Sequence, residues 1–211
     1  MQFLRWTFSV TLLLAAQASG QAGQGGPAAG PGAGAPPMVL SSAAFSDGGQ
    51  IPVKYTAAAD RTSPALRWTN TPPNTVSFVL HMHDLDAAIN HTTEDSLHWL
   101  VWNIPGSATG LPEGVPQGAQ LKDGSYQVSS KTQLDQRGQG YRAPGAGANG
   151  PMHHYTFELF ALDTKLDVTP AADAFDTRRN VMQALQGHVL GKAVYVGLFH
   201  LPMGVTPRPL P

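Results

Sequence analysis

The sequence lacks cysteine altogether, and this absence excludes two kinds of site. Without cysteine among its 211 residues, the chain forms no disulfide and holds no metal through thiolates. Charge is also scarce, because Asp, Glu, Lys and Arg together make up 13% of the residues and the formal net charge is −1. Nucleic-acid-binding surfaces and polybasic membrane-binding segments both need clustered Lys and Arg. The composition therefore argues against nucleic acid as a partner and against a basic membrane-surface patch.

The apolar run near the N-terminus, residues 8–16, is shorter than the ~20 residues that span a bilayer. It follows Arg5 and runs into the small-residue motif at residues 16–18, with alternative cleavage motifs within residues 18–22. This order is typical of a cleaved signal peptide. We predict that residues 1–18 are a signal peptide, that the protein is exported to the periplasm or secreted, and that it has no stable membrane span.

Residues 19–37 consist almost entirely of Gly, Ala, Pro and Gln, and have nothing to bury. Such a composition predicts a disordered tail. The remainder, residues 38–211, is long enough for one domain with a full core, in a chain that is 42% hydrophobic. The 23 glycines and 18 prolines favour many turns over long helices.

Short alternating segments predict a mainly β fold, an antiparallel β-sandwich with a few peripheral helices near the C-terminus. We expect strands at residues 38–40, 51–55, 66–68, 75–83, 97–103, 155–162 and 193–201. One helix is expected, with Pro170 at its first position, residues 171–186 as its apolar-patterned body, and Gly187 placed to end it.

Ionisable side chains stand at the ends of three of these apolar rows. Side chains alternate along a strand, so every second residue lies on the same face. Asp84 ends the row formed by Phe78, Leu80 and Met82. His98 begins the row of Leu100 and Trp102, and His153 and Tyr155 begin the row of Phe157 and Leu159. Rigid strands that end in polar residues are a common way to present a pocket. We therefore predict a ligand-binding pocket formed by Asp84, Asp86, His98, His153 and Tyr155.

Structural roles compete with this interpretation. A histidine beside tryptophan in a strand is more often a hydrogen-bonded structural residue. Asp84 and Asp86 could instead organise the turn that follows them. The sequence assigns no role to His91, His188 or His200.

The sequence supports neither a metal site nor a serine nucleophile. His81 and His83 lie two apart on one strand face, but Leu85 stands where zinc hydrolases with such a pair place an aspartate. No G-x-S-x-G motif occurs, and Ser107 lies in a Gly/Pro loop. The sequence therefore predicts no metal, no cofactor and no catalytic residue.

The order of the segments resembles the phosphatidylethanolamine-binding protein family, also known for Raf kinase inhibitor protein, and most of all its bacterial branch. The matching pieces are Ile51-Pro52, Tyr55-Thr56, residues 63–68, Asp84-Leu-Asp-Ala87, His98-Trp99, Asn103-Ile-Pro105, Gly140-Tyr141, His153-His-Tyr155, Ala161-Leu-Asp163 and Gly187-His-Val-Leu190. The resemblance implies a β-sandwich with a small surface cavity for anions such as phosphate, acetate or a phospholipid head group. It also implies that the five predicted pocket residues fall on cavity positions.

Two segments depart from the family pattern. Asp84-Leu-Asp-Ala-Ala88 lacks both prolines of the family's D-P-D-A-P, and Gly145-Ala-Gly147 stands where prolines are common.

The leading hypothesis is an exported, non-enzymatic binding protein for a small anion. His98 and His153 would each offer an N–H and Tyr155 an O–H, with no Lys or Arg required. Asp84 or Asp86 would orient an imidazole or attract the ammonium of an ethanolamine head group. The alternatives are a protein-interaction module, such as a protease or kinase inhibitor with an unknown partner, and a hydrolase that uses the same His and Asp residues.

Overall fold

A computed structural model describes residues 36–89, 91–131 and 136–208. Its elements are β1 (Val39–Ser41), β2 (Gly49–Gln50), η1 (Val53–Tyr55), β3 (Leu66–Thr69), β4 (Ser77–Asp84), β5 (Ser96–Pro105), β6 (Gly110–Leu111), β7 (Tyr126–Val128), β8 (His153–Leu162), α1 (Ala174–Ala184) and β9 (Val189–Phe199). The mainly β class predicted from the sequence is confirmed. The predicted signal peptide and most of the predicted tail lie outside the described residues. Within the described part of the chain, no helix is long and apolar enough to cross a membrane.

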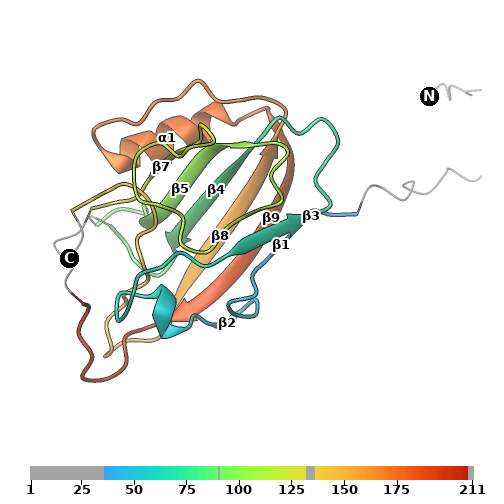
Figure 1. The fold of residues 1–211 in the computed structure, drawn as a ribbon. Coiled ribbons are helices and arrows are strands. Elements are labelled where there is room, and N and C mark those ends of the chain that lie inside the picture. The colour runs from blue at the N-terminus through green and yellow to red at the C-terminus, as the bar shows by residue number, and fades with distance from the viewer. Residues whose placement is uncertain (1–35, 90, 132–135, 209–211) are drawn as a thin grey trace, which may run out of the picture. The chain divides into compact units, whose positions relative to one another are not determined.

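The strands form two sheets, of three and six strands (Figure 1). The smaller sheet has the order β1-β3-β6, and the larger has the order β2-β9-β8-β4-β5-β7. The strands pair antiparallel as predicted, except that β2 runs parallel to β9.

Two apolar clusters hold these layers together, one on each face of the large sheet. The cluster between the sheets contains Trp68, Phe78, Trp99 and Phe157, all at most 2% exposed. The second cluster lies between the large sheet and α1 and contains Val79, Leu100, Trp102 and Val181. The central strands β4 and β5 are thus buried on both faces, which makes them a rigid platform for whatever stands at their ends.

Some sequence predictions of local structure were wrong. The strand expected at residues 51–55 is instead the 3-10 helix η1, because Pro52 cannot donate to a strand ladder. The helix begins at Ala174 and not near Pro170, because the Asp173 side chain caps it by accepting the backbone N–H of Phe175 and of Asp176. The strands β6 and β7 are too short to produce a periodic pattern, and were missed.

A β-bulge at His98 also corrects the predicted strand face. Met82 pairs with Trp99 and His83 pairs with Leu97, so His98 has no partner on β4. The extra residue interrupts the alternation of side chains along β5. His98 lines a cavity on the side of the inter-sheet core, whereas Leu100 packs under α1. The prediction that His98 shares a face of β5 with Leu100 and Trp102 is therefore wrong.

Candidate functional site

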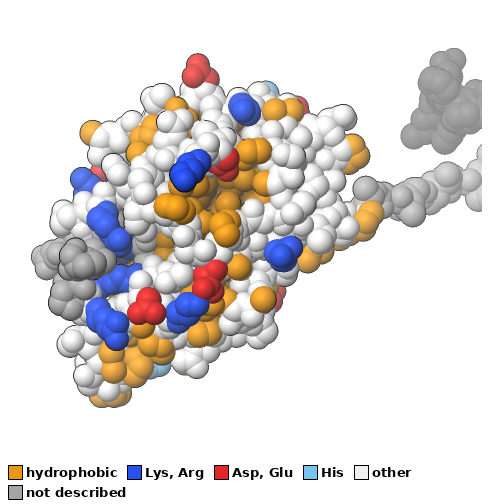
Figure 2. All heavy atoms as spheres, viewed as in Figure 1, with side chains coloured by type: hydrophobic (Ala, Val, Ile, Leu, Met, Phe, Trp, Pro, Cys, Tyr) orange, Lys and Arg blue, Asp and Glu red, His pale blue; other side chains and the backbone are white. Residues whose placement is uncertain are grey.

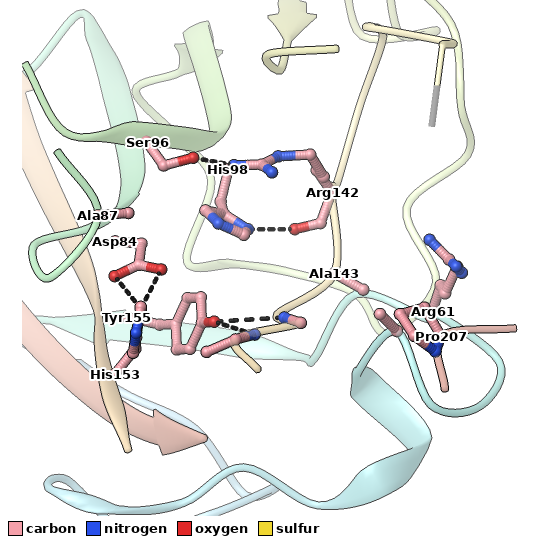
Figure 3. Close-up of a pocket in the computed structure, with 13 residues that line it drawn as sticks. Arg61, Asp84, Ala87, Ser96, His98, Arg142, Ala143, His153, Tyr155 and Pro207 are labelled. Atoms are coloured by element: carbon pink, nitrogen blue, oxygen red, sulfur yellow. Dashed lines mark hydrogen bonds and ion pairs between the residues drawn. The ribbon is translucent and has the colours of Figure 1, made fainter. Parts of the chain in front are cut away.

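The register of the central strands brings several polar residues to one end of the large sheet. Asp84, the last residue of β4, pairs with Ser96 at the start of β5 and with Tyr155 near the start of β8. A cavity of about 450 Å³ lies at this end (Figure 3). Its lining residues are Ala57, Arg61, Asp84, Ala87, Ser96, His98, Arg142, Ala143, Gly145, Ala146, His153, Tyr155 and Pro207.

Four of the five predicted pocket residues line this cavity, namely Asp84, His98, His153 and Tyr155. Asp86 does not line it. The Asp86 carboxylate accepts the backbone N–H of His154 at 2.6 Å and lies 2.9 Å from His154 Nδ1. Although desolvation opposes ionisation, these contacts with His154 hold the pKa of Asp86 below its usual value. Asp86 therefore helps to fix the chain at the start of β8.

Asp84 and His153 form a hydrogen-bonded pair inside the cavity. His153 Nδ1 lies 2.8 Å from Oδ2 and 3.0 Å from Oδ1 of the carboxylate (Figure 3). Asp84 is only 4% exposed, and its Oδ1 also accepts the backbone N–H of Asp86. Because an ionised carboxylate can only accept, Nδ1 of His153 carries a proton. The pair leaves Nε2 of His153 as the ring nitrogen available to a ligand.

His98 is held in one tautomer by a backbone carbonyl. Its Nδ1 donates to the carbonyl oxygen of Arg142 at 2.8 Å, and the residue is 3% exposed. Burial, reinforced by the positive charge of Arg142, holds the pKa of His98 well below its usual value. The ring is therefore neutral, and its Nε2 is an acceptor. The N–H that sequence analysis directed at an anion is bonded to Arg142 instead.

Tyr155 presents a neutral hydroxyl to the cavity. Its oxygen accepts the backbone N–H of Gly145 at 3.2 Å and of Ala146 at 3.1 Å. Burial and the nearby charge of Asp84 raise the pKa of Tyr155 far above its usual value. The hydroxyl thus keeps its own proton as a donor. Proline has no N–H, so the Gly and Ala at these two positions make both hydrogen bonds possible.

Arg61 and Arg142 also line the cavity, although the sequence analysis did not include them among the pocket residues. The Arg142 guanidinium donates to Ser96 Oγ and, at 3.2 Å, to the carbonyl of Leu97. The Arg61 guanidinium donates to the carbonyl of Arg208. In the sequence, the only indication that Arg142 belongs to the pocket is its position directly after the Gly140-Tyr141 motif.

Positively charged side chains outnumber negatively charged ones among the described residues that line the cavity. Among the described residues, its lining has the guanidiniums of Arg61 and Arg142 and the carboxylate of Asp84. On the face shown in Figure 2, Lys and Arg side chains are interspersed with Asp and Glu. That face therefore offers no broad basic field for a polyanion. The positive excess in the cavity suits a small anion.

Comparisons with known proteins show which family the chain resembles. Residues 41–200 match the family model described as phosphatidylethanolamine-binding protein. A UPF0098 protein of Methanothermobacter thermautotrophicus is 40% identical over 162 residues, which are 77% of this chain and 98% of the relative.

The chain is also similar to a solved crystal structure and to a relative that is named as a lipoprotein. The crystal structure of CT736 from Chlamydia trachomatis, a homologue of phosphatidylethanolamine-binding protein, has a TM-score of 0.62 at 27% identity. That match covers 77% of this chain and 97% of CT736. LppC of Mycobacterium tuberculosis, named as a lipoprotein, is 30% identical over 78% of this chain and 73% of its own length. The chain belongs to the phosphatidylethanolamine-binding protein family.

Proposed function

We propose that the protein is an exported, non-enzymatic binding protein whose cavity takes a small anion, a phosphate group either free or in a phospholipid head group. The observation that carries this proposal is the charge of the cavity. Among the described residues that line it, Arg61 and Arg142 contribute two guanidiniums and Asp84 contributes one carboxylate. Hydrogen bonds from charged donors are stronger than those between neutral groups, and donors held in place need little reorganisation on binding.

The other lining groups suit a phosphate that carries a polar substituent. The Tyr155 hydroxyl, held by two backbone N–H groups, donates its proton to a phosphate oxygen. His153, oriented by Asp84, donates through Nε2 when its ring is protonated. The neutral His98 ring offers an acceptor at Nε2, which suits an ammonium or hydroxyl group of the same ligand.

A hydrolase is the weaker candidate because no Ser or Thr hydroxyl is hydrogen-bonded to an imidazole among the described residues. Serine and threonine nucleophiles need a base within hydrogen-bonding reach. In the part of the chain that the structure describes, the hydrogen-bonded imidazoles pair with carboxylates or carbonyls and none pairs with a Ser or Thr hydroxyl. The Ser96 hydroxyl, which lines the cavity, is bonded by Arg142. These contacts favour binding without turnover.

Export is supported by the N-terminal sequence. Residues 1–18 have the charge, apolar core and small-residue motif of a signal peptide. LppC of Mycobacterium tuberculosis is named as a lipoprotein, which is in keeping with export in this family.

Calorimetry with phosphoethanolamine and with inorganic phosphate tests the proposed ligand class. We expect weak, saturable binding with a Kd of roughly 0.1–1 mM, as suits few contacts. His153→Gln should weaken it, whereas His188→Gln, whose exposed ring contacts Asp163, should leave it unchanged. No binding of either probe would contradict the proposal, as would a phosphate-ester hydrolysis that His153→Gln abolishes.

A further inference from the structure

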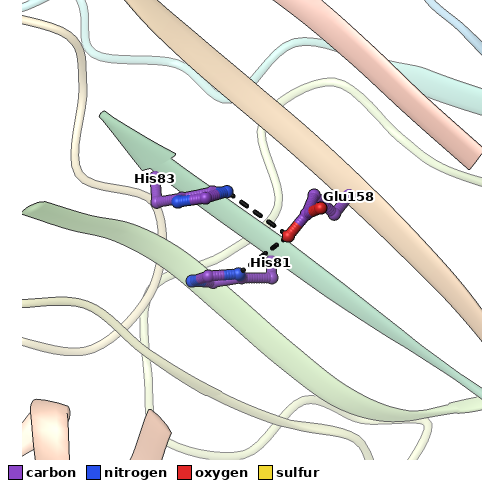
Figure 4. A group of neighbouring side chains, drawn as sticks. All are labelled: His81, His83 and Glu158. Carbon is purple, nitrogen blue, oxygen red and sulfur yellow. Dashed lines mark ion pairs between the residues drawn. The ribbon is translucent and has the colours of Figure 1, made fainter. Parts of the chain in front are cut away.

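Two histidines of β4 are buried against each other on the face of the large sheet that α1 covers (Figure 4). His81 and His83 project from the same side of β4 as Val79, which belongs to the apolar cluster under α1. Their rings are stacked, with centroids 4.1 Å apart and planes inclined by 14°. His81 is 5% exposed and His83 is 7% exposed. Two titratable rings in face-to-face contact are thus shut off from water.

The His83 ring has a carboxylate oxygen beside each of its nitrogens. Nδ1 lies 2.5 Å from Asp95 Oδ2, and Nε2 lies 3.4 Å from Glu158 Oε2. Because ionised carboxylates can only accept, a ring with a proton on both nitrogens fits this environment best. Although burial disfavours the charge, the two carboxylates raise the pKa of His83 to about 9. His83 is therefore an imidazolium at neutral pH.

The His81 ring is held in the neutral form. Neither of its nitrogens makes a hydrogen bond within the described residues, and Glu158 Oε2 lies 3.4 Å from Nδ1. Burial lowers the pKa of His81 against the opposing effect of Glu158, and the charges of His83 and Arg178 lower it further. A neutral ring that lies flat on an imidazolium is a favourable arrangement, because the cation faces the π-electrons. A second proton would replace this contact by two stacked like charges.

The charged groups around the two rings come from four other parts of the fold, namely Asp95 before β5, Glu158 of β8, Arg178 of α1 and Lys192 of β9. Although burial opposes it, His83 and Arg178 hold the pKa of Asp95 below its usual value. The two imidazoles hold the pKa of Glu158 below its usual value as well. Both carboxylates are thus ionised and already paired with cations, so a proton on His81 would add a buried positive charge without a free counter-charge among the described residues.

Of the elements around the pair, α1 is the one that can yield to this repulsion. The strand β4 is held by antiparallel ladders to β5 and to β8, so it cannot move without breaking backbone hydrogen bonds. The helix α1 is joined to the sheet through side chains. Val181 packs in the apolar cluster, and Arg178 donates to the carboxylate of Asp95 at 2.5 Å and to its carbonyl at 3.2 Å. Elements held in this way open at a lower free energy than central strands.

We propose that the stacked pair of His81 and His83 is a pH-sensitive switch that controls whether α1 stays packed on the large sheet. With α1 released, water reaches the pair, and His81 titrates near the ~6.5 of a free imidazole. The open state then binds the proton more tightly than the closed state, so opening becomes more favourable as the pH falls below ~6.5. His83 keeps its charge in both states, because Asp95 and Glu158 belong to the sheet. One proton is linked to opening, so the opening constant should rise by up to ~10-fold per pH unit.

Hydrogen–deuterium exchange of the full-length protein between pH 7.5 and pH 5 tests the switch. After correction for the intrinsic pH dependence of exchange, the protection of residues 174–184 should fall by up to ~10-fold per pH unit below pH ~6.5, while β4 and β8 stay protected. In His81→Phe, which keeps a stacked ring that cannot titrate, the protection of α1 should not depend on pH. Constant protection of α1 in the wild type, or the same loss in His81→Phe, would overturn the proposal. So would the loss of β4 protection in step with α1, because that is global unfolding.

A control variant and a second measurement complete the test. His188 follows α1 directly, and its exposed ring pairs with Asp163, so it is the nearest other titrating group. His188→Gln should keep the pH dependence of the wild type, and its loss there would overturn the assignment to His81. Should His81→Phe not fold, NMR titration of the histidine rings in the wild type decides. At pH 7 it should find His83 charged and His81 neutral, and the reverse, or a charge on both rings, would overturn the proposal.

Discussion

Asp84 and His153 face each other across two neighbouring strands, with His153 Nδ1 2.8 Å from Asp84 Oδ2. The contact arises because β4 ends where β8 begins, with Asp84 in register with Tyr155. A carboxylate behind an imidazole fixes the tautomer and the orientation of the ring. The two residues should therefore act on a bound anion as one unit.

A double-mutant cycle on phosphoethanolamine binding measures that coupling. Asp84→Asn and His153→Gln should each weaken binding by roughly 1–3 kcal/mol, because each removes a charge-assisted hydrogen bond or its support. The double variant should be little worse than either single variant, since both changes disable the same unit. Calorimetry gives all four affinities. Strictly additive losses would show that the two residues contact the ligand independently.

Tyr155→Phe should destabilise the fold as well as the site. The hydroxyl oxygen accepts the backbone N–H of Gly145 and of Ala146, and the change would leave both without that partner. We expect the free energy of unfolding to fall by about 1–3 kcal/mol, measured by urea denaturation. Tyr126→Phe is the matched control, because its ring stacks on Trp102 and its hydroxyl has no hydrogen bond in the described part of the chain. Equal effects of the two changes would contradict this role of the Tyr155 hydroxyl.

The long central strands could be predicted from the sequence, because their side chains alternate over many residues. Phe78, Leu80 and Met82 lie on the core side and Asp84 ends their row at the cavity, as the period of two requires. His98 was assigned to the wrong row, because a bulge depends on how β5 pairs with β4 and leaves no local sequence pattern.

Long-range contacts explain the remaining omissions. Arg142 reaches the cavity from a loop whose path is set by contacts such as its own backbone N–H to the carbonyl of His98. Glu158 lies beside His81 and His83 because of the register between β4 and β8. Neither relationship can be read from residue spacing along the chain, because each joins segments that only the fold brings together.

Signal-peptide processing gives a prediction for the N-terminus. Arg5, the apolar residues 8–16 and the small-residue motifs up to residue 22 should direct cleavage, so that the mature protein begins between about residues 19 and 23. Intact-mass measurement on protein from the cell envelope or medium reads the new terminus directly. Recovery of the protein with Met1 still in place would contradict cleavage. Replacing two leucines of the apolar run by arginine is the control that should keep the protein inside the cell.

The last prediction concerns acid stability and follows from the neutral state of His98. Burial first, and then the charge of Arg142, lower the pKa of His98 in the folded protein, with smaller contributions from His83 and His153. In the unfolded chain the ring titrates near ~6.5. Below that pH the unfolded state binds more protons than the folded state, so the contribution of His98 to stability is lost as the pH falls.

His98→Asn is the variant that isolates this effect. Its amide can still donate to the Arg142 carbonyl in place of Nδ1, but it does not titrate. Urea denaturation from pH 8 to pH 5 should show a constant difference in unfolding free energy between the two proteins above pH ~7. Below pH ~6.5 the unfolding free energy of the wild type should fall by up to about 1.4 kcal/mol per pH unit more than that of the variant. The other titrating groups are common to both proteins, so their effects cancel in this difference. Parallel pH profiles would mean that folded His98 takes up its proton as readily as the unfolded chain, and its burial against Arg142 would then have no effect on acid stability.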